Sequence, residues 1–222
     1  MLKRLIFALN AAIIAVLGFA TYSLLAPGPG ATKAFCSGCF AVLGAVNALY
    51  VLLRGGKRLF AVVMALGLAL AMQADIAING NFVKGAALFA LAHLCYLAGY
   101  CLLVPPRWKD SLWSLALLVP AALYLLCDPG LHFRPASLRR VCMGYAAVIS
   151  LMTGKAAANL FRQRSVLTGV LLAGSVLFFA SDLLLVMDMF RDGGALFGTL
   201  CISLYYPAEA LLAHGMLYAA RS

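Results

Sequence analysis

Residues 59–78 read LFAVVMALGLALAMQADIAI, an apolar run interrupted by the polar side chains of Gln73 and Asp75. A helix that crosses the hydrocarbon core of a bilayer needs about 20 apolar residues, so this stretch has the length and composition of a transmembrane span. A carboxyl group inside such a span is costly, and it usually faces the protein interior and marks a functional position. The run therefore predicts a membrane fold and singles out Asp75.

The rest of the chain repeats this pattern. Of its 222 residues, 65% are hydrophobic and 11% are charged, and the mean hydropathy is +1.00. This composition excludes a water-soluble enzyme. Charged residues, glycine and proline separate eight candidate spans, and the fifth is the shortest. They cover residues 5–25, 34–53, 59–78, 82–104, 112–127, 136–160, 166–190 and 195–219.

We therefore predict an all-α membrane protein with eight transmembrane helices in a compact bundle, forming a single integral domain over residues 1–222. The first run follows Lys3 and Arg4 as in a signal peptide, but it has nearly full spanning length and no Ala-x-Ala-like cleavage site before Pro27. We interpret it as the first span. The Cys36-Ser-Gly-Cys39 motif and the other cysteines lie mostly in apolar runs, where packing is their expected role.

The charge distribution predicts the orientation of the bundle. The chain has 17 Lys and Arg against seven Asp and Glu, a net charge of +10. The basic residues are scattered, which argues against nucleic acid and favours the anionic headgroups of a lipid bilayer. Ten basic residues lie on the side of the membrane that carries both termini: Lys3, Arg4, Arg54, Lys57, Arg58, Arg107, Lys109, Arg162, Arg164 and Arg221. On the other side lie six: Lys33, Lys84, Arg134, Arg139, Arg140 and Arg191. This excess predicts cytoplasmic termini, in the plasma (inner) membrane if the chain is bacterial.

An internal similarity relates the third and fourth spans to the seventh and eighth. After Asp75 follow Phe82, Gly85-Ala-Ala-Leu-Phe89 and Tyr96; after Asp182 follow Phe190, Gly194-Ala-Leu-Phe197 and Tyr205. The spacings agree to within one residue. The pattern favours two parallel four-helix halves, about 1–104 and 105–222. Chance similarity between apolar segments is the alternative.

Asp75 and Asp182 also lie at matching depth. From residue 59 to 75, and from 166 to 182, the chain advances 16 residues, about 24 Å along a helix. Two carboxyls at equal depth on parallel helices can face each other across a cavity. Such a pair can supply both the general acid and the general base of a reaction. The alternative is that each carboxyl only hydrogen-bonds a neighbouring helix.

Among the remaining polar residues, Glu209 is the other strong candidate for a polar interior. Asp188 lies near a helix end, whereas Glu209 belongs to the interior, as a functional group or as a packing partner of Lys155 or a tyrosine hydroxyl. His93 lies near mid-membrane without the HxxxH or HxxE spacing of a metal site, so we expect no metal there. The acids expected in ordinary loops are Asp110, Asp128 and Asp192.

Taken in order, these residues resemble the YhhN family of integral membrane lysoplasmalogenases. The resemblance runs from about Lys33 to Tyr206 and rests on five motifs. They are Ala74-Asp75; Phe82-x-x-Gly85-x-x-x-Phe89-x-x-x-His93-x-x-Tyr96; Tyr145-x-x-x-Ile149-Ser-x-Met152; Gly174-x-x-Leu-Phe178-x-x-Ser181-Asp182-x-x-Leu185; and Tyr205-Tyr206-x-Ala208.

The resemblance implies an enzyme that hydrolyses the vinyl-ether bond of a lysophospholipid with an alkenyl chain, without a cofactor. The products are a fatty aldehyde and glycerophosphoethanolamine or glycerophosphocholine. We expect Asp75 and Asp182 to be the catalytic pair, and Lys33 and Lys84 to bind the headgroup. Water or substrate would be oriented by His93, Tyr205, Glu209, Ser181 and Tyr145. The alternatives are a proton-coupled transporter of a small molecule or lipid that uses the same carboxylates, and a structural or lipid-binding membrane protein.

Overall fold

The computed structural model describes residues 2–28, 30–191 and 195–220, which form eight α-helices, one short 3-10 helix and no strand. The helices are α1 (Leu2–Leu25), α2 (Lys33–Arg54), α3 (Arg58–Ile78), α4 (Phe82–Leu103), α5 (Asp110–Cys127), α6 (Ser137–Arg162), α7 (Val166–Phe190) and α8 (Leu196–Gly215). Each is long and apolar enough to cross a membrane. The predicted all-α fold with eight spans is confirmed, and the chain is an integral, multi-pass membrane protein.

The helix ends follow local sequence signals. Thr32 caps α2 by accepting a hydrogen bond from the Phe35 N–H, and Asn81 caps α4 in the same way. Gly55 ends α2 with a φ of 71°, a left-handed conformation that favours glycine. The eighth predicted span extends past α8 because it includes the 3-10 helix Met216–Ala219. Three residues used in the predictions lie outside the described residues: Asp192, Gly194 and Arg221.

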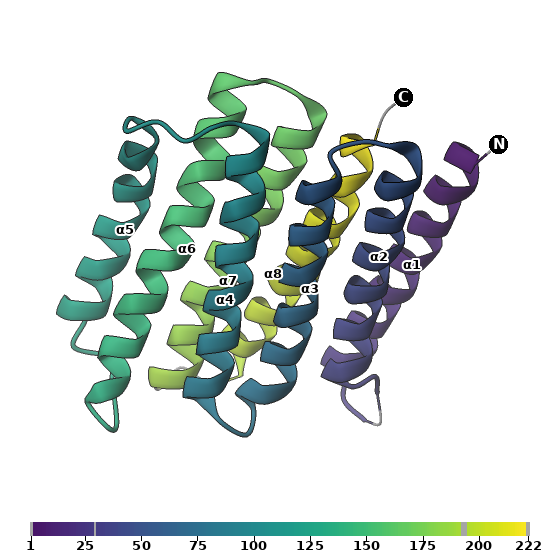
Figure 1. Cartoon of the computed structure of the whole chain (residues 1–222). Coiled ribbons are helices and arrows are strands. Elements are labelled where there is room, and N and C mark those ends of the chain that lie inside the picture. Colours follow the sequence, from purple (N-terminus) through teal and green to yellow (C-terminus); the bar gives the residue numbers. More distant parts are fainter. Residues whose placement is uncertain (1, 29, 192–194, 221–222) are drawn as a thin grey trace.

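The helices run alternately up and down, so the two ends of the chain lie at the same end of the bundle (Figure 1). We call this the terminal end, and the end that carries the α1–α2, α3–α4, α5–α6 and α7–α8 connections the distal end. Helix α3 packs along α4 as α7 packs along α8, and α2 contacts α8 as α6 contacts α4. This matching order of contacts is what two parallel halves would produce; the repeat itself stays a prediction.

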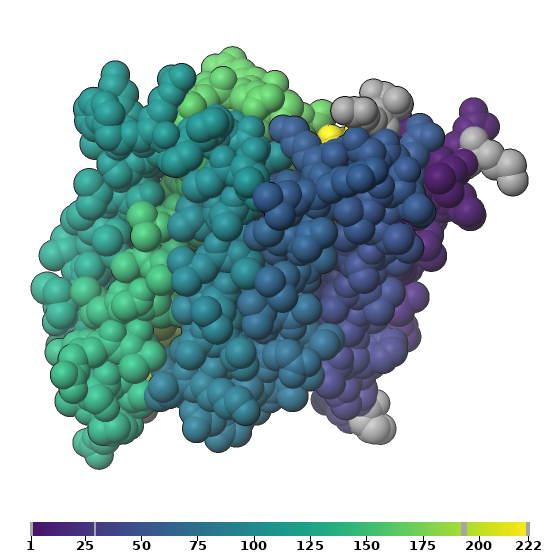
Figure 2. Space-filling model, viewed as in Figure 1, coloured from purple at the N-terminus to yellow at the C-terminus, as the bar shows by residue number. Residues whose placement is uncertain are grey.

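One apolar core joins every helix except α5, and its largest fully buried side chains include Tyr96, Tyr206 and Phe178. In the space-filling view α5 and α1 form the two edges of the visible face (Figure 2). The surface is apolar as well: Phe19 is 73% exposed and Leu53 70%. Exposed apolar side chains of this size suit a surface surrounded by lipid.

Helix α5 approaches α6 closely at one glycine. A Cβ atom added at Gly154 would lie 2.5 Å from the backbone nitrogen of Ser114. Only a residue without a side chain therefore permits this distance between the two helices.

Candidate functional site

Asp75 lies near the distal end of α3, where three helices converge on its carboxylate. Its Oδ2 atom accepts hydrogen bonds from Ser37 Oγ on α2 and, at 2.9 Å, from the Tyr206 hydroxyl on α8. Lys33 Nζ, at the beginning of α2, is 3.9 Å from Oδ1 and donates to Asn79 Oδ1 at 3.2 Å. The carboxylate is buried, and two donors and one cation hold it in a fixed orientation.

Asp182 occupies the corresponding place on α7 and is also buried. Its Oδ2 atom accepts a hydrogen bond from the Tyr145 hydroxyl on α6 at 2.6 Å. The Tyr145 oxygen is in turn 2.7 Å from His93 Nε2 on α4, and His93 Nε2 lies 3.6 Å from Asp182. Because Tyr145 donates its proton to Asp182, its oxygen accepts from the His93 Nε2–H. The three side chains form a continuous chain of hydrogen bonds.

The two aspartates line the same cleft at the distal end of the bundle. Lys33, Phe89, Ser181 and Tyr205 are among its other lining residues. Its volume is about 30 Å³, more than the roughly 10–15 Å³ that a cavity needs to hold one water molecule. The structure thus brings together the two carboxyls that matching depth singled out.

The two carboxylates are held in similar ways. Asp75 on α3 is bound by α2 of its own half and by α8 of the other. Asp182 on α7 is bound by α6 of its own half and, through Tyr145, reaches α4 of the other. The cleft therefore lies where the predicted halves meet, and its geometry depends on how they pack.

Glu209 lies deeper in the bundle than the cleft and is fully buried. Its Oε2 atom accepts a hydrogen bond from the Tyr96 hydroxyl at 2.8 Å. Of the two packing partners considered from sequence, the tyrosine is confirmed and Lys155 is wrong. Glu209 Oε1, the Tyr205 hydroxyl and His93 Nδ1 have no hydrogen-bond partner among the described residues. Buried polar groups usually have one, so these three atoms keep unused hydrogen-bonding capacity.

Two predicted site residues, Ser181 and Lys84, form no hydrogen bond with either carboxylate. Ser181 donates to the Cys201 carbonyl at 3.1 Å, so it lines the cleft while bonding α7 to α8. Lys84 is exposed near the beginning of α4, and its side chain makes no hydrogen bond or ion pair with any residue that the structure describes. In those same ranges no group of three His, Cys, Asp or Glu side chains is placed to hold a metal ion.

Sequence reasoning missed Ser37 and Tyr206, the two hydrogen-bond donors to Asp75. Ser37 lies inside the Cys36–Cys39 motif, which we had interpreted as packing. Its position one helical turn after Lys33 was the available signal, because residues four apart share a helix face. For Tyr206 the sequence offered no comparable signal, since the choice between Tyr205 and Tyr206 depends on how α8 is rotated.

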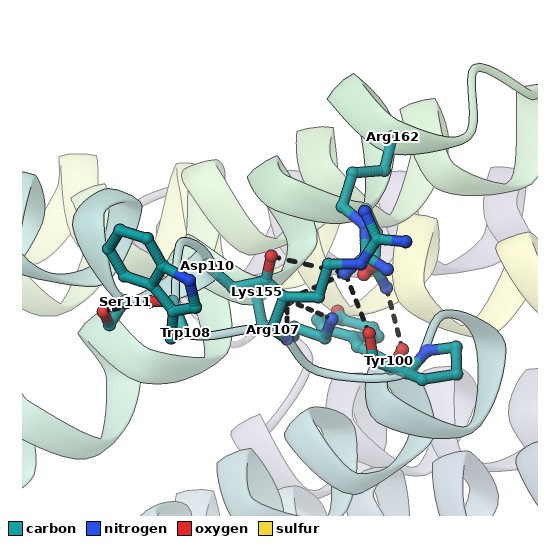
Figure 3. Close-up of polar contacts among 9 residues, drawn as sticks. Tyr100, Arg107, Trp108, Asp110, Ser111, Lys155 and Arg162 are labelled. Carbon is teal, nitrogen blue, oxygen red and sulfur yellow. Dashed lines mark hydrogen bonds and ion pairs between the residues drawn. The ribbon is translucent and has the colours of Figure 1, made fainter.

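A second buried charged cluster lies at the terminal end (Figure 3). Asp110 Oδ2, at the start of α5, is 2.7 Å from Lys155 Nζ and 3.0 Å from Arg162 Nη1, both on α6. It also accepts from the backbone N–H of Arg107 at 3.0 Å. The prediction that Asp110 is an ordinary loop residue is wrong, because this carboxylate is buried and pairs α5 with α6. Asp128, by contrast, lies in a loop and pairs with the exposed Arg191.

An eight-span bundle in which two buried aspartates line one cleft defines a polytopic membrane protein with an acidic site near the distal end of the bundle. The YhhN family profile matches residues 31–216, which include α2 to α8, so the chain belongs to the YhhN family. Helix α1 lies outside the matched region. The comparisons with curated proteins and with solved structures give no match.

Proposed function

We propose that this chain is a membrane lysoplasmalogenase, an ether hydrolase that cleaves the vinyl-ether bond of a lysophospholipid with an alkenyl chain. The supporting observation is that Asp75 and Asp182 line one cleft, each held by its own hydrogen-bond donors, in a chain of the YhhN family. Two carboxyls in one small space suit a reaction that needs one proton donor and one proton acceptor.

The chemistry divides into two proton transfers. A carboxylic acid protonates the β-carbon of the vinyl ether, which leaves an oxocarbenium ion stabilised by the ether oxygen. The other carboxylate takes a proton from water as the water oxygen adds to the cationic carbon. The resulting hemiacetal collapses to the aldehyde and releases the glycerol oxygen as an alcohol. Inverting glycosidases likewise use one carboxylic acid as the proton donor and one carboxylate to activate water, around a similar cation.

The neighbouring residues have supporting roles in this proposal. Tyr145 and His93 orient Asp182, and Ser37 and Tyr206 orient Asp75. Tyr205, Glu209 and Ser181 surround the water or the glycerol part of the substrate. Lys33, at the rim of the cleft, contacts the headgroup phosphate, and Lys84 adds positive charge at the same end.

The test measures aldehyde release from a lysoplasmalogen by detergent-purified protein, with and without chelator. We expect Asp75→Asn and Asp182→Asn each to lower the rate by about 100-fold or more, since general acid–base catalysis contributes at least that factor. Asp188→Asn is the matched control, because Asp188 is exposed on the same helix as Asp182, and it should keep the wild-type rate.

Aldehyde release at the wild-type rate by either site variant would disprove the paired-carboxyl mechanism. If the wild-type protein releases no aldehyde in either condition, the enzyme proposal fails. Substrate flux without product in sealed liposomes would then support the transporter alternative.

A further inference from the structure

A groove of about 330 Å³ runs between α1 and α8. Its α1 wall includes Leu17, Gly18 and Tyr22, and its α8 wall includes Ser203, Tyr206 and Pro207. The α1 residues that line it span positions 14–25, about 16 Å of helix. Its volume falls within the range of about 300 to 1,000 Å³ that is typical of ligand sites, and apolar walls with a few polar groups are typical of them as well.

Tyr206 connects this groove with the carboxylate site. Its side chain lines the groove, and its hydroxyl donates to Asp75 Oδ2 at 2.9 Å. A single side chain therefore separates an apolar groove on the lipid-facing surface from one of the two carboxyls.

Two other apolar cavities lack this combination of size and position. The groove between α1 and α2 holds about 480 Å³, but none of its lining residues, which include Val16 and Gly38, is a hydrogen-bond partner of either carboxylate. The cavity beside Tyr145 and Asp182 adjoins the cleft but holds only about 30 Å³, too little for a hydrocarbon chain.

Helix α1 is held by polar contacts at Asn10 in its first half and by apolar packing in its second half. Asn10 and Asn47 on α2 exchange hydrogen bonds of 2.7 and 2.9 Å, and His214 Nδ1 on α8 is 3.0 Å from Asn10 Oδ1. Beyond Asn10, only Leu17 and Ala20 among the described residues of α1 are buried. The groove therefore lies along the part of α1 that packs on the apolar core through Leu17 and Ala20.

We propose that the α1–α8 groove binds the hydrocarbon chain of a single-chain lysophospholipid whose polar end lies at the Asp75 cleft. The class of lipid rests on the proposed function. Helix α1 lies outside the region that the family profile matches, whereas Asp75 and Asp182 lie within it. In this proposal, a helix outside the matched region therefore helps to select the hydrocarbon chain of the lipid.

Photoaffinity labelling tests the groove independently of catalysis. The probe is a lysophosphatidylcholine with a diazirine at mid-chain, and the labelled peptides of the wild-type protein are mapped by mass spectrometry. We expect adducts within residues 17–25 of α1 together with adducts within residues 203–210 of α8. Adducts that map instead to the α1–α2 groove, or to residues around Phe82 and Val141, would overturn the proposal. This result does not depend on whether the protein releases aldehyde.

Gly18→Phe tests the consequence for substrate selection. A Cβ at Gly18 meets no atom within 4 Å, and Gly18 lines the groove, so we expect the added ring to occupy space in the groove. We expect labelling to fall, and KM for a long-chain substrate to rise, by about tenfold or more, since shape changes in apolar pockets have effects of that order. KM for a short-chain substrate should stay unchanged.

Gly38→Phe is the matched control, because Gly38 has the same open surroundings and lines the α1–α2 groove. It should change neither labelling nor KM. If Gly18→Phe abolishes labelling while leaving the long-chain KM unchanged, the groove holds only bulk lipid and the proposal is wrong. Gel filtration in detergent checks folding of both variants, and the wild-type labelling map decides the matter if Gly18→Phe does not fold.

Discussion

The Tyr145 hydroxyl links Asp182 to His93 through hydrogen bonds of 2.6 and 2.7 Å. Tyr145→Phe removes both hydrogen bonds and keeps the ring. Hydrogen bonds to charged groups contribute about 1.5–3 kcal/mol, so we expect kcat for aldehyde release to fall by about 10- to 100-fold with little change in KM. Tyr124→Phe is the control, because the Tyr124 hydroxyl has no hydrogen-bond partner among the described residues. Equal rates for the two variants would remove Tyr145 from the mechanism.

At the scale of the helices, two glycines of α6 should respond in opposite ways to the same substitution. Gly154→Ala forces Ser114 and α5 away and disturbs the neighbouring Lys155–Asp110 pair; overpacking of this kind costs about 1–3 kcal/mol. Gly144→Ala meets no atom within 4 Å and should stabilise the helix by about 0.5–1 kcal/mol. Thermal unfolding in detergent measures both. An unchanged or raised unfolding temperature for Gly154→Ala would show that the α5–α6 distance does not depend on Gly154.

At the scale of the whole molecule, the charge bias predicts which side of the membrane each end faces. Arg54, Lys57 and Arg58 lie at the terminal end, so we expect that end to face the cytoplasm. Green fluorescent protein fused to the C-terminus should fluoresce in bacteria, and alkaline phosphatase at the same position should be inactive. Fusions in the α3–α4 connection, at residues 79–81, serve as the control and should give the reverse. Active alkaline phosphatase at the C-terminus would contradict the predicted orientation.

The sequence by itself determined the eight spans and the two central carboxyls. Span length and apolar content are local properties, because the bilayer requires about 20 apolar residues of any helix that crosses it. The cost of burying an acid is local too, so Asp75 and Asp182 could be recognised without knowing their neighbours. The contacts between the helices follow from neither property.

Only the tertiary structure decided which groups surround these carboxyls. Ser37 and Tyr206 are 38 and 131 residues from Asp75, and the rotation of α2 and α8 about their axes brings them to it. Asp110 was misjudged for the same reason: its partners Lys155 and Arg162 lie 45 and 52 residues away. Helices that are apolar on nearly all sides carry little periodicity to fix their rotation. Packing at residues such as Gly154 therefore selects the face that each helix buries, and with it the groups that meet in the cleft.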